Sequence, residues 1–180
     1  MIIPNGCNSF YIDHPERNAN WSTFVSEELP ERCRQMFHLS DKREDTYIAG
    51  ISMGGYGALY NGLVHISKFS KVAALSPASD PYIKEGNLSE MASFGREEFH
   101  SIFGTYEEYL NSSAYLAGGY ASADKEELPQ IFLGCGDRDI AVGSQVTALE
   151  TAFCNAGIEP NTRNSLRIPD DLGTNDAIVK

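Results

Sequence analysis

The chain carries, at residues 46–57, the run Thr46-Tyr47-Ile48-Ala49-Gly50-Ile51-Ser52-Met53-Gly54-Gly55-Tyr56-Gly57. This run contains the pattern G-x-S-x-G, with Ser52 at its centre. A β-branched and aromatic segment precedes the pattern, and the helix-like segment 58–64 follows it. A strand, a sharp turn and a helix in this order predict a nucleophile elbow, in which the turn presents the serine hydroxyl to a base.

The glycines around Ser52 have a steric purpose in such a turn. Gly50 and Gly54 lack the Cβ atoms that would clash between strand and helix, and Gly55 and Gly57 are expected to let the first helical turn pack closely under the strand. The start of the helix would direct N–H groups toward a developing oxyanion. The alternative interpretation is a glycine-rich turn in which Ser52 caps the helix.

Length and composition predict a single globular domain over residues 1–180, because 42% of the 180 residues are hydrophobic and 22% are charged. No apolar run approaches the length of a membrane span, and the N-terminus lacks the regions of a secretory signal. The net charge of −11 would repel phosphate backbones and anionic lipids. We therefore expect neither nucleic-acid nor membrane partners, and the oligomeric state stays open.

The four cysteines form no C-x-x-C pair, and no histidine stands at metal-ligand spacing beside them. We therefore expect no metal site and no cofactor. Cys33, Cys135 and Cys154 lie in apolar stretches and are predicted to pack as small core residues. A reduced, cytoplasmic setting fits this usage, and the even count leaves disulfides open.

Apolar patterning predicts three short strands, at residues 46–49, 71–75 and 130–133. Residues 21–37 have helical spacing that Pro30 interrupts, which predicts a kink or a helix beginning afresh there. Further helices are expected from the serine turn to about residue 66 and over residues 142–156, with Gly157 as the C-cap. Strands alternating with helices predict an α/β fold with a mostly parallel sheet flanked by helices.

Two segments lie outside this alternation. Residues 76–128 show no sustained period and exceed an ordinary loop, so they are predicted to form a helical insertion over the site. The best helical patches in this insertion are residues 99–103 and 106–110. At the start of the chain, the apolar residues 1–3 are interpreted as the end of a buried strand.

A second candidate catalytic group follows the third strand, in the run Gly134-Cys135-Gly136-Asp137-Arg138-Asp139. Serine hydrolases of this architecture carry serine, acid and histidine in that order, with the acid on a loop at the carboxyl end of the sheet. Position alone does not choose between Asp137 and Asp139. The structural alternative is an acidic turn in which Asp139 caps the next helix.

The run 48–57 resembles the elbow of the esterase D-type family, which includes S-formylglutathione hydrolases, feruloyl and acetyl-xylan esterases, and bacterial tributyrin esterases. Segments similar to the tributyrin esterase branch are residues 4–11, 27–30, 42–44 and 103–104, and the resemblance runs from about residue 1 to 157. It implies a partial α/β-hydrolase fold and hydrolysis of short-acyl or small-alcohol esters through an acyl-enzyme. By resemblance, Ser52 matches the nucleophile, Asp139 the acid, and the N–H of Met53 one oxyanion donor.

Two family features have no counterpart in this sequence. Family members carry earlier strands with a His-Gly loop that supplies the other oxyanion donor, and a later Gly-x-His-x-Trp stretch that holds the base. The histidines of this chain are at positions 14, 38, 65 and 100, and His65 lies too far along the elbow helix to reach Ser52. We therefore expect a severely weakened or inactive esterase. The alternatives are a non-catalytic fragment that keeps the fold and a ligand pocket, and acyl transfer to an alcohol.

Overall fold

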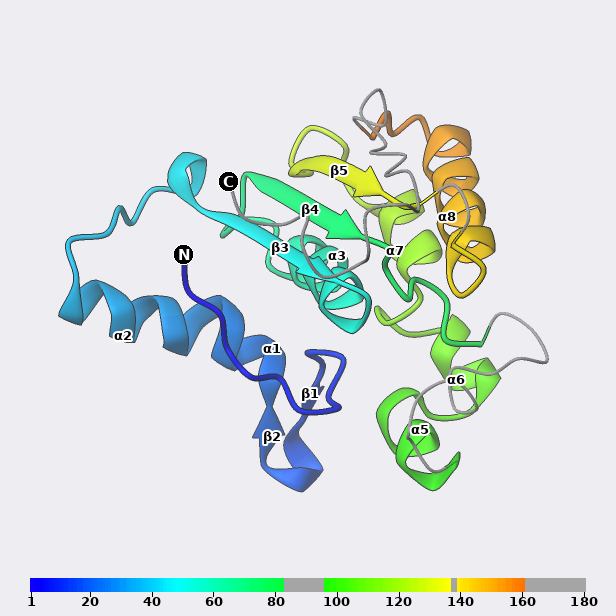
Figure 1. The fold of residues 1–180 in the computed structure, drawn as a ribbon, viewed down its shortest axis with the longest axis horizontal. Coiled ribbons are helices and arrows are strands. Elements are labelled where there is room, and N and C mark those ends of the chain that lie inside the picture. The colour runs from blue at the N-terminus through cyan, green and yellow to red at the C-terminus, as the bar shows by residue number, and fades with distance from the viewer. Residues whose placement is uncertain (83–95, 137–138, 161–180) are drawn as a thin grey trace.

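The computed structural model describes residues 1–82, 96–136 and 139–160 (Figure 1). Its strands are β1 (Asp13–His14), β2 (Ala19–Asn20), β3 (Tyr47–Ile51), β4 (Lys71–Leu75) and β5 (Gln130–Gly134). Its α-helices are α1 (Trp21–Thr23), α2 (Leu29–Met36), α3 (Met53–Val64), α5 (Arg96–Phe103), α6 (Tyr106–Leu110), α7 (Leu116–Ser122) and α8 (Gly143–Asn155). Short 3-10 helices span Pro15–Arg17 and Arg43–Asp45, and a π-helical segment spans Phe24–Glu28.

The central sheet has the order β3-β4-β5, and both pairs are parallel. The register aligns Ile51 with Leu75 and Leu75 with Gly134, so the three strands end at one edge. The predicted parallel sheet is confirmed, with β3 and β5 extending slightly beyond the predicted strands. In the described residues β3 pairs only with β4, which leaves its other edge unpaired.

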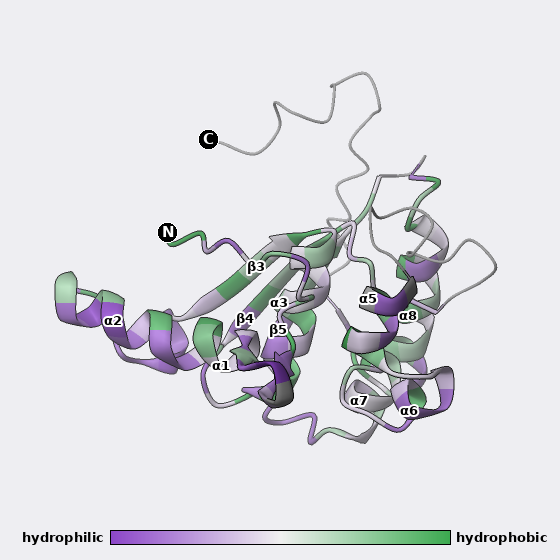
Figure 2. Ribbon diagram, turned by 90° about the horizontal axis from the view of Figure 1, so that it is seen from below, coloured by the Kyte–Doolittle hydropathy of each residue, from purple (hydrophilic) through white to green (hydrophobic). Residues whose placement is uncertain are grey.

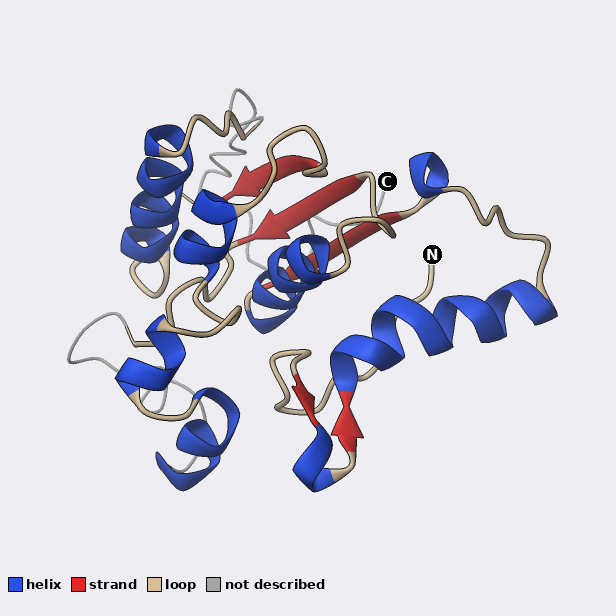
Figure 3. Cartoon of the chain, turned by 180° about the vertical axis from the view of Figure 1, so that it is seen from behind, coloured by secondary structure: helices blue, strands red, loops and turns tan. Residues whose placement is uncertain are grey.

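One helix packs against the face of this sheet, and other helices lie beyond its β3 and β5 edges. Helix α3 packs against β3 and β4, and α7 packs against α3 and α8. The arm formed by α1 and α2 lies on the β3 side, and α8 lies on the β5 side (Figure 3). The strands and α3 are mainly hydrophobic, whereas α2 is mainly hydrophilic (Figure 2). None of the described helices is both long and apolar enough to cross a membrane.

The helix predicted over residues 21–37 continues past Pro30 by changing its winding. In the π-helical turn before it, the N–H of Leu29 donates to the carbonyl oxygen of Phe24, five residues earlier. Helix α2 then begins at Leu29, with Pro30 in its first turn, where a missing N–H costs nothing. The helical stretch is therefore continuous, because Thr23, Glu28 and Leu29 at the junctions all have right-handed helical backbone angles, and the alternative of a separate helix beginning near Pro30 is not what forms.

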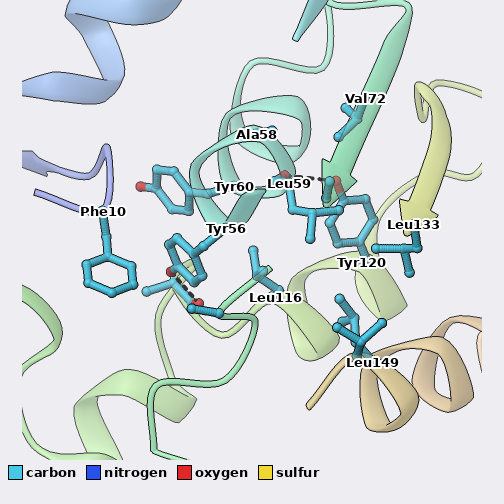
Figure 4. Close-up of a cluster of buried hydrophobic side chains, with 14 of the residues drawn as sticks. Phe10, Tyr56, Ala58, Leu59, Tyr60, Val72, Leu116, Tyr120, Leu133 and Leu149 are labelled. Atoms are coloured by element: carbon cyan, nitrogen blue, oxygen red, sulfur yellow. Dashed lines mark hydrogen bonds between the residues drawn. The ribbon is translucent and has the colours of Figure 1, made fainter. Parts of the chain in front are cut away.

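Buried tyrosines form much of the core between α3, α7 and the sheet (Figure 4). The hydroxyl of Tyr56 donates to the carbonyl oxygen of Ala114 at 2.7 Å, and that of Tyr120 donates to Leu59 at 2.8 Å. Each buried phenol therefore combines a large apolar surface with a satisfied polar end. Tyr120 lies on α7, a helix that the apolar pattern did not predict.

Glycine explains why α7 was missed. The pair Gly118 and Gly119 lowers the helix propensity of this short segment, although Leu116 and Tyr120, four residues apart, are both fully buried. A Cβ on Gly119 would lie 2.5 Å from Cδ2 of Leu63, so the glycine permits close packing against α3. The helical patches predicted at residues 99–103 and 106–110 are confirmed by α5 and α6.

Three smaller predictions are corrected or confirmed by burial. Residues 1–3 form no strand, and Met1 and Ile3 are exposed, so their interpretation as a buried strand end is wrong. Cys33 is buried as predicted and Cys135 is half-buried, whereas Cys154 is exposed on α8. Cys154 lies on the outer face of that amphipathic helix, opposite the buried side. All four cysteines are free.

Candidate active site

Ser52 occupies a sharp turn between the end of β3 and the start of α3. Its backbone has φ 54° and ψ −117°, a conformation that typically costs a non-glycine residue about 1–3 kcal/mol. Hydrogen bonds from neighbouring segments hold it there: the N–H of Ser52 donates to the carbonyl oxygen of Leu75 at 3.0 Å. Its own carbonyl oxygen accepts from the N–H groups of Tyr56 and Ala78, at 3.0 and 3.2 Å.

The Ser52 side chain is exposed and makes no capping hydrogen bond to α3. The alternative in which Ser52 caps the helix is therefore not supported, because its hydroxyl accepts no hydrogen bond from the first turn of α3. The N–H of Met53 belongs to the first helical residue and has no acceptor within the helix. An exposed hydroxyl therefore stands beside the positive end of a helix.

Gly50 is the glycine that the turn requires most strictly. A Cβ on Gly50 would lie 2.9 Å from the Cα of Gly54 and still closer to its carbonyl carbon and oxygen. At Gly55, a Cβ would lie 3.1 Å from the carbonyl oxygen of Leu75 and from Pro77, a tight but less severe approach. These contacts agree with the close packing predicted for the first turn of the helix.

Gly57 and Gly54 differ in what surrounds them. A Cβ on Gly57 would lie 2.9 Å from Cγ of Tyr11, and closer to Cδ2, because that ring covers the helix. A Cβ on Gly54 meets no described atom within 4 Å. The steric requirement predicted for Gly54 is therefore wrong within the described part of the chain, and the space there is open.

Asp139 lies in the turn between β5 and α8, half-buried, whereas Asp137 falls outside the described residues. Its Oδ1 accepts hydrogen bonds from the N–H groups of Ala141 at 3.0 Å and Val142 at 3.1 Å. Its Oδ2 lies 3.7 Å from the Sγ of Cys135, which donates to it. The carboxylate thus stabilises the entry to α8, as the structural alternative anticipates, and directs its second oxygen toward the end of β5.

Ser52 and Asp139 follow strands that end at the same edge of the sheet. Strand β4 lies between them, so the two loops are separated by two strand spacings, roughly 10 Å. No hydrogen bond in the described part of the chain joins the two side chains directly. A third side chain would have to bridge that gap to connect them.

A buried polar cluster that sequence reasoning missed ties the N-terminal segment to α3. Asn61, fully buried, accepts hydrogen bonds from the hydroxyls of Ser22 and Ser26 at 2.8 and 2.9 Å. Its amide donates to the carbonyl oxygens of Gly57 at 2.8 Å and Tyr11 at 3.3 Å. The one available signal was an asparagine inside an otherwise apolar helix.

His65 extends this cluster at the far end of α3. Its Nε2 lies 2.8 Å from the hydroxyl oxygen of Ser22. Because the Ser22 hydrogen is directed to Asn61, the imidazole must be the donor, with its hydrogen on Nε2. Burial lowers the pKa of His65, while the carboxylates of Glu27 and Asp13 act in the opposite direction. His65 therefore has structural contacts at the end of α3, which agrees with the prediction that it does not reach Ser52.

The other histidines are distributed over the surface and the N-terminal segment. His100 is exposed on α5, with its Nδ1 3.1 Å from the carbonyl oxygen of Gly104. His14 is buried in β1, and His38 is exposed after α2. Within the described ranges, no three His, Cys, Asp or Glu side chains gather closely enough to hold a metal ion.

Residues 1–164 match the model of a protein family described as Putative esterase. The chain is 33% identical over 148 residues to an acetyl esterase of Caldicellulosiruptor saccharolyticus, covering 79% of the chain and 55% of that relative. It is 34% identical over 101 residues to an S-formylglutathione hydrolase of Paracoccus denitrificans, covering 53% of the chain and 32% of that relative. The chain therefore spans little more than half of one curated relative and a third of the other.

Among solved structures, the fluorophosphonate-binding serine hydrolase F of Staphylococcus aureus matches with a TM-score of 0.67 at 24% identity. The match covers 87% of this chain and 59% of that one. Together with the parallel sheet and its flanking helices, this likeness shows part of an α/β-hydrolase fold. The predicted fold class is confirmed.

Proposed function

This chain belongs to the family described as Putative esterase, and from that membership we propose that it is a serine carboxylesterase acting on short-acyl esters. The observation that carries the proposal is the exposed Ser52 hydroxyl, held by a strained turn at the carboxyl edge of a parallel sheet. The names of the two relatives, an acetyl esterase and an S-formylglutathione hydrolase, support small acyl groups. The assignment to the tributyrin esterase branch stays a prediction.

In the proposed reaction the Ser52 Oγ attacks the ester carbonyl carbon and its proton passes to solvent water, which takes the place of a histidine base. The negative charge that develops on the carbonyl oxygen is stabilised by the N–H of Met53 at the start of α3. The bond to the alcohol breaks, the alcohol leaves with the proton, and the acyl group stays on Ser52. Water then attacks the acyl-enzyme, which releases the acid and restores the serine. Among the described residues no atom lies within 4 Å of a Cβ placed on Gly54, which supports an approach of the ester from that side.

Asp139 is the proposed acid of this site. Two backbone N–H groups already fix its Oδ1, so Oδ2 is the oxygen that could orient an imidazole between the two loops. The sequence has no histidine after Asp139. Residues 1–180 alone are therefore expected to turn over esters slowly. Their catalysis would come only from the presented serine, the oxyanion donor and substrate binding, without a histidine base.

A second candidate is a non-catalytic chain that keeps the fold and binds small esters without hydrolysing them. In acyl transfer, an added alcohol would take the acyl group from Ser52, so its ester would form in place of part of the free acid. In each case the segment 76–128 is proposed to form an insertion over the site, with α5, α6 and α7 as its described helices. A cytoplasmic location stays a prediction.

A fluorophosphonate probe tests the role of Ser52. We expect slow, selective labelling of Ser52, located by peptide mass spectrometry, and complete loss of this label in Ser52→Ala. The matched control is Ser122→Ala, which removes an exposed hydroxyl on α7 and should leave labelling unchanged. An unlabelled Ser52 in folded protein would refute the esterase proposal for this chain.

Turnover of a chromogenic acetate ester separates the two candidates. The esterase proposal expects slow hydrolysis that Ser52→Ala abolishes and Ser122→Ala preserves. Labelling of Ser52 without any hydrolysis above that of Ser52→Ala would favour the non-catalytic alternative.

A further inference from the structure

The Cys135 thiol lies between two polar side chains at the carboxyl end of β5. Its Sγ accepts a hydrogen bond from the hydroxyl of Ser76, with 3.9 Å between oxygen and sulfur. The thiol in turn donates to Oδ2 of Asp139, with 3.7 Å between sulfur and oxygen. A chain of three groups therefore runs from the end of β4, across the end of β5, to the loop that carries the carboxylate.

We propose that Cys135 is a positioning residue for Asp139, a role that rests on the proposed function of that carboxylate as the acid. The two backbone N–H groups that hold the carboxylate, those of Ala141 and Val142, both donate to Oδ1. The thiol supplies a second point of attachment at Oδ2. Groups that orient a partner in catalysis depend on such supporting hydrogen bonds to hold their geometry.

The environment of Cys135 keeps its thiol in the form that can donate. Burial raises the pKa of Cys135, and the negative charge of Asp139 raises it further, while the hydrogen bond from Ser76 acts in the opposite direction. The sulfur therefore retains its hydrogen at neutral pH. A cysteine that only filled space, as the sequence predicted, would not need both polar neighbours.

Ser76 reaches the sulfur from a strained backbone position. Its φ is +41°, in the left-handed region that non-glycine residues seldom adopt, and its N–H donates to the carbonyl oxygen of Gly134 at 2.7 Å. Ser52 and Ser76 thus follow adjacent strands of one sheet edge, both with positive φ. Strain of this kind persists only where surrounding contacts hold it, and such residues cluster at functional sites.

Alkylation kinetics test whether the thiol contacts the carboxylate in solution. The full chain and Asp139→Asn are treated with iodoacetamide across a pH series, and each cysteine is followed by peptide mass spectrometry. In Asp139→Asn the loss of the negative charge should shift the curve of Cys135 alkylation rate against pH to lower pH. The alkylation rate should rise several-fold at about pH 8, since a fall of one pKa unit means about tenfold more thiolate. The exposed Cys7 and Cys154 serve as internal references. Coincident Cys135 profiles in the two proteins would overturn the contact.

Amide NMR signals test whether the thiol positions the carboxylate. Cys135→Ala should shift the amide protons of Ala141 and Val142, which bond to Oδ1, and Cys135→Ser should restore them because its hydroxyl can donate. The matched control, Cys33→Ala, removes a buried thiol in α2 and should leave both signals in place. If the two amide signals do not shift in Cys135→Ala, or do not return in Cys135→Ser, Cys135 only packs in the core and does not position the carboxylate.

These two measurements do not depend on ester turnover. An unreactive Ser52 would refute the esterase proposal and leave the Cys135–Asp139 contact standing, whereas coincident alkylation profiles would refute the contact alone. Asp139→Asn also keeps Cys135 in place, so the alkylation result does not require the Cys135→Ala protein to fold.

Discussion

The two glycines that flank Ser52 in the G-x-S-x-G pattern should respond in opposite ways to alanine. In Gly50→Ala the new Cβ would lie within 3.0 Å of the Cα, carbonyl carbon and carbonyl oxygen of Gly54. Overpacking typically costs 1–3 kcal/mol, and we expect about 3 kcal/mol because the atoms met are backbone atoms that cannot rotate away. For a chain of this size that loss corresponds to a melting temperature lower by roughly 6–12 °C.

Gly54→Ala is the matched control on the other side of the serine. Its Cβ meets no described atom within 4 Å, and alanine is better than glycine in a helix by at most about 1 kcal/mol. We expect this variant to be as stable as the parent or slightly more so. Slower labelling of Ser52 in a stable Gly54→Ala protein would indicate that the ester approaches through this space.

Urea unfolding and thermal unfolding, both followed by circular dichroism, provide the comparison. The expected order of stability is Gly54→Ala, then the parent, then Gly50→Ala. If the two alanine variants unfold within about 0.5 kcal/mol of each other, the turn does not have the strained geometry that Ser52 shows in this structure, and the Ser52 hydroxyl is not presented by that turn.

Three further changes test the surroundings of the site. Asn61→Ala should cost about 2–4 kcal/mol in urea unfolding, because it leaves several buried partners without their hydrogen bonds. Since burial lowers the pKa of His65 in the folded state, the unfolded chain binds the proton more readily, so stability should fall as pH drops below about 6.5. Urea unfolding of His65→Gln should show a flatter pH dependence over that range, and an unchanged slope would exclude His65 as the source. The edge of β3 that is unpaired in the described residues is expected to promote self-association, which Ala49→Lys should reduce in light scattering; association that Ala49→Lys does not reduce would exclude this edge as the contact.

Local patterns in the sequence were sufficient for the elements that bear the candidate site. The apolar runs before Ser52 and before Asp139 predicted β3 and β5, and the glycines after the serine predicted a close turn into a helix. These features depend on residues that are neighbours along the chain, so they can be predicted from local composition and periodicity. The pattern failed at α7, where the requirement for a small residue comes from Leu63 on another helix.

The sequence by itself therefore determined the strands β3, β4 and β5, the helices α3 and α8, and which residues follow the strands at the carboxyl edge. Only the tertiary structure decided that Gly50 is constrained while Gly54 is open, that Asn61 joins two serines of the N-terminal segment to α3, and that Cys135 meets Asp139 rather than only packing in the core. The physical reason is that secondary structure follows from interactions within a few residues, whereas these contacts depend on strand register and helix faces, which bring together groups far apart in the chain.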